Sequence, residues 1–301
     1  MSTALENKTH GRYIGKPVKR LEDGKFLTGK GTYLDDLALE GTLHLMLLRS
    51  LYAHARIRGI ATEEARQVPG VVAVYTAADL PELHAPGSGG RDAKVVRHPV
   101  LAQEEVRYTG QPVAAVLAVS RAAAEDALGL MAVDYEALEA VPDPLEALED
   151  RTLVHPDLGT NRALERKTSA GDVEGAFSRA HKVVGARMVQ QRLAPAPMEP
   201  RGVLAAWDGV HQALTVWSST QMPHDLRSAV AEALALAENQ VRVITPDVGG
   251  AFGAKINVYP EEILVAYLAR KLGKPVKWVE GRAESFVATV HGRAQVADLE
   301  M

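Results

Sequence analysis

The stretch that decides how this chain is interpreted is Asp247-Val248-Gly249-Gly250-Ala251-Phe252-Gly253-Ala254-Lys255. It follows an apolar run at 241–244 that is typical of a strand. Glycines after a strand let the backbone approach a ligand closely and direct several N–H groups into one space, which suits an anionic or oxo ligand. The spacing is not that of a Walker loop, nor Gly-x-Gly-x-x-Gly. A purely structural turn remains an alternative at this point.

A second segment, Ser218-Ser219-Thr220-Gln221-Met222-Pro223-His224, ends one expected strand and begins an expected helix. Gln221 carries a neutral amide, which can donate one hydrogen bond to a ligand and accept another. A plain helix cap made by Ser219 or Thr220 is the alternative for this segment.

A third segment is Met198-Glu199-Pro200-Arg201-Gly202. Glu199 and Arg201 are two residues apart and could form an ion pair or contact a ligand, and a solvated turn is the alternative. The adjacent acids Glu261 and Glu262 are interpreted as charges at the start of a helix, where they complement its dipole.

The composition of the chain argues against several classes of function. The 301 residues include 34 Lys and Arg against 38 Asp and Glu, a net charge of −4, which disfavours general binding to nucleic acid or anionic membranes. Hydrophobic residues make up 47%, enough for a buried core. The chain has no cysteine, so it cannot itself hold an iron–sulfur cluster or a thiolate zinc site. No closely spaced histidine pair indicates a zinc site.

No run of about 18 apolar residues predicts a membrane span. The first residues are polar and lack the apolar core of a signal peptide, so the expected location is the cytoplasm.

Apolar runs, helix caps and turn residues predict an alternation of strands and helices. Ser120 and Asp172 are expected N-caps, and Gly273 is an expected C-cap. Helices are expected at 62–67, 121–131, 173–180, 223–237 and 261–272. Strands are expected at 42–49, 71–75, 112–119, from 133, and at 183–192, 202–207, 211–218, 241–244, 276–279 and 294–301.

Four segments allow more specific predictions. Residues 112–135 resemble a βαβ unit, and Asp208-Gly209 favours a tight hairpin turn. Residues 84–94 are expected to form a loop. The last expected strand has no obvious partner after it, which suggests that the chain is part of something larger.

Taken together and in order, these segments resemble the large chain of the molybdenum hydroxylases, the family of xanthine dehydrogenase, aldehyde oxidase and aerobic carbon monoxide dehydrogenase. Beside the three segments above, the resemblance rests on Ile14-Gly15-Lys16-Pro17-Val18, Arg20-Leu21-Glu22-Asp23, the run from Phe26 to Asp36, Ala53-His54-Ala55-Arg56-Ile57 and Gly110-Gln111-Pro112-Val113-Ala114. It covers nearly the whole chain, and the subtype is similar to bacterial chains that work beside separate flavin and iron–sulfur subunits.

The resemblance implies an α+β fold with two domains. An α/β-hammerhead-like domain with an extended N-terminal arm is expected over 1–145, and a linker over 146–170. The first part of a molybdopterin cofactor-binding domain is expected over 171–301.

The resemblance also implies roles. The cofactor would be molybdenum-molybdopterin, in the cytosine dinucleotide form, with Gln221 near an oxo ligand of the metal. The backbone of Gly249, Gly250, Ala251, Phe252 and Gly253 would face the cofactor, and no side chain of this chain would ligate the metal. The reaction would oxidise carbon monoxide, an aldehyde or an N-heterocycle with oxygen from water. Electrons would pass to [2Fe–2S] clusters on a small subunit and to FAD on a medium subunit.

No residue of this chain can be assigned as the general base, a glutamate that the family carries further along. A second chain supplying the C-terminal half is therefore expected, and activity is expected to need it. Ile256 stands where xanthine-oxidising members carry a substrate-contacting glutamate, which disfavours a purine substrate. The alternatives are a truncated, non-catalytic fragment, a docking scaffold for the flavin and iron–sulfur subunits, and an unrelated binding module whose motif matches are coincidental.

Overall fold

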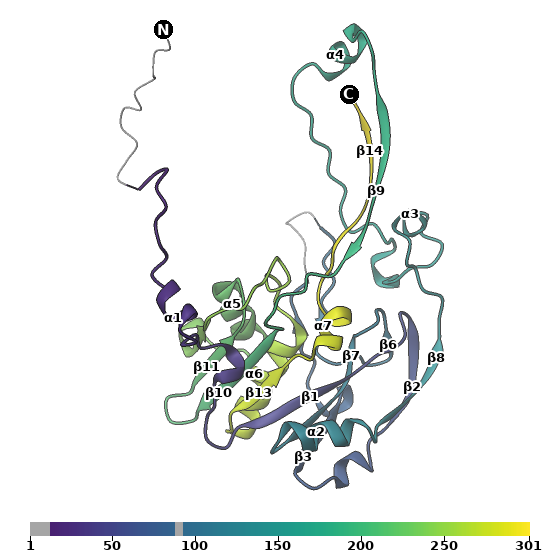
Figure 1. Ribbon diagram of the computed structural model, residues 1–301. Coiled ribbons are helices and arrows are strands. Elements are labelled where there is room, and N and C mark those ends of the chain that lie inside the picture. Colours follow the sequence, from purple (N-terminus) through teal and green to yellow (C-terminus); the bar gives the residue numbers. More distant parts are fainter. Residues whose placement is uncertain (1–12, 88–92) are drawn as a thin grey trace. The chain divides into compact units, whose positions relative to one another are not determined.

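The computed structural model (Figure 1) describes residues 13–87 and 93–301, and the chain divides into two compact units, 1–32 and 33–301. In the described part of the first unit, α1 (Asp23–Leu27) is a single short helix. The side chain of Arg20 pairs with Asp23 at its start. The expected extended arm is thus interrupted by a helical turn, and its first 12 residues lie outside the described residues.

A seven-stranded sheet forms the centre of the second unit, with strands drawn from both ends of the chain. Most neighbours are antiparallel, but β1 is parallel to β13 and β11 is parallel to β12. The order across the sheet is β12 (Val241–Ile244), β11 (Ala213–Ser218), β10 (Gly202–Asp208), β13 (Val276–Val279), β1 (Leu43–Arg49), β7 (Pro112–Ala118) and β3 (Val71–Thr76).

Side chains of the central strands point alternately to the two faces of this sheet, and a hydrophobic core forms on each face. Leu45 and Leu47 of β1 belong to the larger core, which α5 (Pro223–Ala233) and α6 (Pro260–Leu272) complete. Met46, between them, packs against the smaller core under α2 (Arg121–Leu128). Because successive strand residues point to opposite faces, a strand covered on both sides must be apolar throughout. All seven residues of β7 are accordingly buried.

The prediction of a βαβ unit over 112–135 is wrong. β7 lies in the seven-stranded sheet, but β8 (Ala132–Ala137) pairs antiparallel with β2 (Ala55–Ala61) in a separate three-stranded sheet that β6 (Glu105–Val106) completes. Burial explains the difference, since β8 alternates between half-buried and exposed residues and covers only one face.

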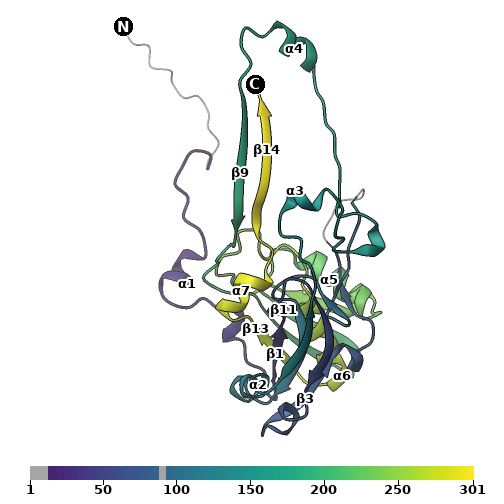
Figure 2. The same ribbon diagram turned by 90° about the vertical axis from the view of Figure 1, so that its right-hand side faces the viewer.

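The last strand, β14 (Gly292–Glu300), pairs with a strand that lies earlier in the chain. It pairs antiparallel along its length with β9 (Gly185–Leu193), which precedes it by about a hundred residues. Figures 1 and 2 both show the two strands side by side as a ribbon. Every residue of β9 is exposed. The sequence gives no sign of this pairing because neither strand has a buried face to define its register.

The expected caps are confirmed. The hydroxyl of Ser120 accepts from the N–H of Ala123, and the carboxylate of Asp172 accepts from the N–H of Gly175 in α4 (Val173–Arg179). Gly273 ends α6 in the left-handed conformation, with φ 61°. The tight turn at Asp208-Gly209 is wrong: four residues, 209–212, join β10 to β11. The carboxylate of Asp208 accepts two backbone N–H groups of this loop.

The expected helix over 62–67 is reduced to a 3₁₀ turn at Ala65–Gln67, and α5 stops at Ala233, earlier than expected. The expected loop over 84–94 begins with β4 (His84–Ala85), which pairs with β5 (His98–Pro99), and residues 88–92 of it lie outside the described residues. The remaining elements are α3 (Pro144–Ala147), α7 (Arg282–Ala288) and 3₁₀ turns at Leu34–Asp36, Ala77–Asp79, Pro156–Leu158 and Glu238–Gln240. Among the residues described, no helix has the length and apolar character needed to cross a membrane.

Candidate functional site

The glycine-rich loop after β12 adopts backbone conformations that explain its composition. Gly250, Phe252 and Gly253 have φ of 96°, 53° and 87°, in the left-handed region that side chains other than glycine disfavour. A Cβ atom on Gly249 would lie 2.5 Å from the Cβ atom of Glu199, so that position also requires glycine for space. Phe252 tolerates its strained conformation with 75% of its surface exposed, which is a common sign of a functional position.

The backbone donors of this loop are largely unused. Gly249 donates its N–H to Glu199 and Ala254 donates to the carbonyl of Ala251. Within the part of the chain that the structure describes, the N–H groups between them, of residues 250–253, have no hydrogen-bond partner. Successive free N–H groups on left-handed backbone form a concave donor surface for an anion or an oxo group.

Gln221 is held beside this loop by its backbone. Its N–H donates to the carbonyl of Lys255 at 2.8 Å, and the hydroxyl of Thr220 donates to the same carbonyl at 3.3 Å. The Gln221 residue is exposed, and its carboxamide has no partner among residues 13–87 and 93–301. The structure therefore brings together the two segments that the sequence analysis singled out.

The carboxylate of Glu199, in the third segment, holds the glycine-rich loop and the segment of Gln221 in place. Oε2 of Glu199 accepts from the N–H of Gly249 at 2.8 Å, from the hydroxyl of Ser219 at 2.7 Å and from Nζ of Lys255 at 3.0 Å. Nζ of Lys255 also donates to the Ser219 hydroxyl at 2.7 Å. The Lys255 side chain is fully buried; burial lowers its pKa, and the Glu199 carboxylate partly offsets that effect. A charge-assisted network thus sets the spacing between the glycine loop and the strand end that precedes Gln221.

Glu199 and Arg201 do not pair with each other, and Arg201 does not lie in a solvated turn. Arg201 is 5% exposed and its guanidinium donates to Glu280 at 2.5 Å and to Glu261 at 3.3 Å. Its guanidinium also lies 3.8 Å from the ring centroid of Tyr259, in cation–π contact. The short spacing between Glu199 and Arg201 was misleading because each side chain pairs with distant residues instead, Glu199 with Lys255 and Arg201 with Glu280 and Glu261.

The two acids that begin α6 are buried, although helix-start charges were expected there. Glu261 bridges Arg201 and Arg49, and although burial favours its neutral form, these two guanidinium groups lower its pKa to about 2. Glu262 does cap the helix, since it accepts from the N–H of Tyr259, but burial raises its pKa to about 6. Near pH 5 the carboxyl group of Glu261 is therefore ionised, while that of the neighbouring Glu262 is mostly protonated and neutral.

Several residues of these networks were missed by reasoning from the sequence. Lys255 and Glu199 are 56 positions apart, and Glu280 lies 79 positions beyond Arg201, so no local pattern joins them.

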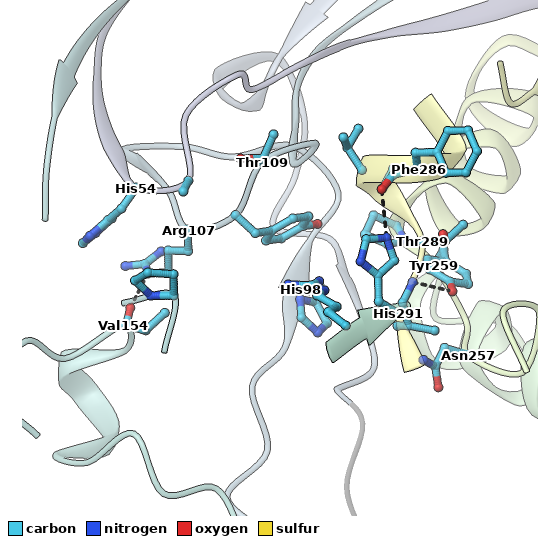
Figure 3. Close-up of a pocket in the computed structure, with 18 of the residues that line it drawn as sticks. His54, His98, Arg107, Thr109, Val154, Asn257, Tyr259, Phe286, Thr289 and His291 are labelled. Atoms are coloured by element: carbon cyan, nitrogen blue, oxygen red, sulfur yellow. Dashed lines mark hydrogen bonds between the residues drawn. The ribbon is translucent and has the colours of Figure 1, made fainter. Parts of the chain in front are cut away.

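A cavity of about 500 Å³ lies elsewhere, between the ends of β6, β8 and β9 and helix α7. Figure 3 shows His54, Arg107 and Val154 at one side of it, Phe286, Thr289 and His291 at the other, and His98 between them. None of the six residues expected to contact a cofactor lines it.

Two family models match the chain. The model described as "Aldehyde oxidase and xanthine dehydrogenase, a/b hammerhead domain" matches residues 28–139, and the model described as "Molybdopterin cofactor-binding domain" matches residues 154–301. The nicotine 6-hydroxylase large subunit of Paenarthrobacter nicotinovorans is 41% identical over 290 residues, which are 95% of this chain and 36% of that protein. The carbon monoxide dehydrogenase large chain of Afipia carboxidovorans is 37% identical over 97% of this chain and 38% of its own length.

Solved structures agree with this result. Quinoline 2-oxidoreductase from Pseudomonas putida 86 superposes with a TM-score of 0.89 at 38% identity, over 95% of this chain and 37% of that one. The Cu,Mo-CO dehydrogenase in its carbon monoxide reduced state gives a TM-score of 0.79 at 36% identity, over 93% of this chain and 37% of that one. The chain therefore spans a little more than a third of the length of the relatives it matches.

Proposed function

Because the chain belongs to the molybdenum hydroxylase family, in the part of the large subunit formed by the hammerhead and molybdopterin cofactor-binding domains, we propose that it provides one wall of a molybdopterin site in an oxidoreductase. The other wall comes from polypeptide that this chain does not span. The proposed domains are residues 1–145 and 171–301, with a linker over 146–170.

The residues of this chain fit such a cofactor. The observation that carries the proposal is a pair of free donor groups on adjoining segments: the carboxamide of Gln221 has no partner among the described residues, nor do the N–H groups of residues 250–253, and the hydrogen bond from Gln221 to Lys255 holds the two segments together. Neutral donor groups without a protein partner suit an oxo ligand, and fixed dipoles of this kind stabilise charge that develops during a reaction.

When bound, the cofactor supplies the two-electron oxidation of a carbon centre with water as the oxygen source. Gln221 would hold an oxo group through its amide, and Gly249, Gly250, Ala251, Phe252 and Gly253 would present backbone to the cofactor. The Glu199–Lys255–Ser219 network keeps both groups in register. The carboxylate of Glu199 already accepts hydrogen bonds from Gly249, Ser219 and Lys255, so we assign the proton acceptor to the other wall.

For the substrate we favour an N-heterocycle over carbon monoxide or an aldehyde, because two of the similar proteins are named for nicotine and quinoline. The hydrophobic, 46% exposed side chain of Ile256 directly after Lys255 is compatible with an apolar ring system. We further propose the cytosine dinucleotide form of the cofactor, a [2Fe–2S] small subunit and an FAD medium subunit as partners, and the cytoplasm as the location.

The experiment is to purify the untagged chain from its native host, with whatever polypeptides accompany it, and to measure molybdenum and pterin per chain. We expect a ratio near one. A ratio near zero would favour the alternative of a docking scaffold without catalysis.

A matched pair of variants sharpens this test. Gly253→Leu and Gly159→Leu both force a side chain onto left-handed backbone, at φ 87° and 69°, and both side chains enter open space. Only the first lies in the proposed cofactor surface. We expect Gly253→Leu to lower the molybdenum ratio at least about fivefold while Gly159→Leu leaves it unchanged; equal loss in both would refute the assignment of the loop.

A further inference from the structure

The cavity in Figure 3 has an unusual chemical character. Its lining contains aromatic and aliphatic side chains, two arginines and three histidines, and neither aspartate nor glutamate. The polar members are His54, His98, Arg107, Tyr108, Thr109, Arg192, Asn257, Tyr259, Thr289 and His291. A volume of about 500 Å³ lies within the range of small-molecule sites.

The two arginines bring positive charge into the lining of the cavity. Burial lowers the pKa of His291, and the neighbouring Arg192 lowers it further. Burial likewise lowers the pKa of His155 behind the lining, followed by the effect of Arg107. These histidines are therefore largely neutral near pH 7 and act as hydrogen-bonding groups, while the arginines carry the charge.

The two arginines differ in how well they are neutralised. Arg107 donates to the carbonyl of Val154 at 3.0 Å and to the carboxylate of Glu105 at 3.3 Å, and Glu105 is the acid that approaches this side of the cavity. Arg192 has no hydrogen bond or ion pair from its side chain among the described residues. Its cross-strand neighbour in the β9–β14 ribbon is another arginine, Arg293.

This pairing of like charges is unfavourable, because residues directly opposite on antiparallel strands lie close together. The backbone at the same point is strained: Arg293 and Ala294 have φ of 71° and 55°. Two facing arginines and two consecutive left-handed residues, at the base of the ribbon next to His291, indicate a place where an anion compensates for an unfavourable arrangement.

The wall of the cavity beside His291 is apolar and aromatic. Phe286 and Val287 of α7, with Val258 and Tyr259, line it, and Nε2 of His291 donates to the carbonyl of Phe286 at 2.8 Å, which fixes the ring. Over the described residues, no group of three or more acidic or histidine side chains could hold a metal ion, so the histidines do not indicate a metal centre.

We propose that this cavity binds a small aromatic carboxylate, with its ring against the Phe286–Val287 wall and its carboxylate held by Arg192. The inference is independent of the molybdopterin proposal, because it uses none of the residues assigned to that site.

The probe is naphthalene-2-carboxylate, and naphthalene-2-carboxamide is its uncharged control. Both are titrated into the purified 301-residue chain by isothermal calorimetry at low salt. We expect the carboxylate to bind at least about tenfold more tightly than the carboxamide, and the difference to shrink at high salt because the attraction is partly screened. Equal affinities, or no binding of either compound, would overturn the proposal.

Three variants locate the site. Arg192→Gln should weaken carboxylate binding about fivefold or more and leave carboxamide binding unchanged. Arg187→Gln, on the same exposed strand but outside the lining, is the matched control and should change neither. Ala140→Glu places an acid in an exposed position of the lining and should abolish carboxylate binding by repulsion. Equal effects of Arg187→Gln and Arg192→Gln would show that the carboxylate responds only to the net charge of the protein and not to this cavity.

Discussion

Two ion pairs of almost equal length lie in opposite surroundings. Arg201 and Glu280 approach to 2.5 Å with their side chains 6% and 0% exposed, at the centre of the second unit. Arg187 and Asp298 approach to 2.6 Å in the β9–β14 ribbon, with side chains 61% and 65% exposed. The difference shows that distance does not set the importance of a charge pair. Water and ions replace the exposed pair at little cost, whereas nothing replaces the buried one.

The largest effect is expected from Arg201→Met. It leaves the buried carboxylate of Glu280 without its guanidinium and removes one of two cations from Glu261, so the free energy of unfolding should fall by about 3–5 kcal/mol. Denaturant unfolding of the purified chain measures it. The double variant Arg201→Met, Glu280→Gln should recover part of the loss, and a loss below about 1 kcal/mol would contradict this view of the buried pair.

A smaller loss, about 2 kcal/mol, is expected from Lys255→Met. Glu199 keeps the N–H of Gly249 and the hydroxyl of Ser219 as donors and is partly exposed, so its charge is not stranded. The specific consequence is local: amide exchange of peptides covering 218–224 and 247–256 should accelerate, while β7 stays protected. Uniform acceleration across the chain would mean that Lys255 has only a general stabilising role.

A third effect depends on pH. Burial raises the pKa of Glu262 from the ordinary 4.5 to about 6, so folding takes up a proton between these values. Its contribution is fully present below pH 4.5 and is lost as the pH rises through 6, about 2 kcal/mol in all. Glu262→Gln keeps the capping side chain without the titration.

The difference between wild type and Glu262→Gln isolates this group, because the histidines titrate in both proteins. Glu261 acts in the opposite sense and in another range: its pKa is lowered to about 2, so its contribution is lost as the pH falls from 4.5. The measurement is the free energy of unfolding of both proteins as a function of pH. If the difference between the two proteins does not change between pH 4.5 and 6.5, the assignment is contradicted.

The smallest effect is expected from Arg187→Gln in the ribbon. Its pKa is raised by the hydrogen bonds to Asp298, yet both side chains are solvated, so the unfolding midpoint should not move measurably. Thermal unfolding measures it, with Arg201→Met as the reference for a buried pair. A shift comparable to that of Arg201→Met would remove the distinction on which the comparison rests.

The same contrast explains what could be predicted from the sequence. The strands at 241–244 and 276–279 and the caps Ser120 and Gly273 are local features, set by nearby apolar runs and turn chemistry, and they are confirmed. The family and the α+β fold could be predicted from motifs in sequence order.

What could not be predicted depends on distant partners. The pairing of β14 with β9 involves strands that bury no face, and the roles of Glu199 and Arg201 depend on Lys255 and Glu280, far away in the sequence. A charge in the sequence does not indicate whether it will be solvated. Gln221 and residues 249–253 were placed near each other through family resemblance, and their part in cofactor binding stays a prediction.

The position of β13 in the sheet has a consequence for how the protein is made. Leu43 of β1 pairs with Val276 of β13, so the edge of β1 has no neighbour on that side until more than 200 further residues have been synthesised. At about 5–20 residues per second this interval lasts roughly 10–50 s. The N-terminal strands therefore cannot complete their sheet as they leave the ribosome, and an unpaired apolar edge stays open to wrong partners during that time. The nascent chain should accordingly depend on chaperones until residue 279 has emerged.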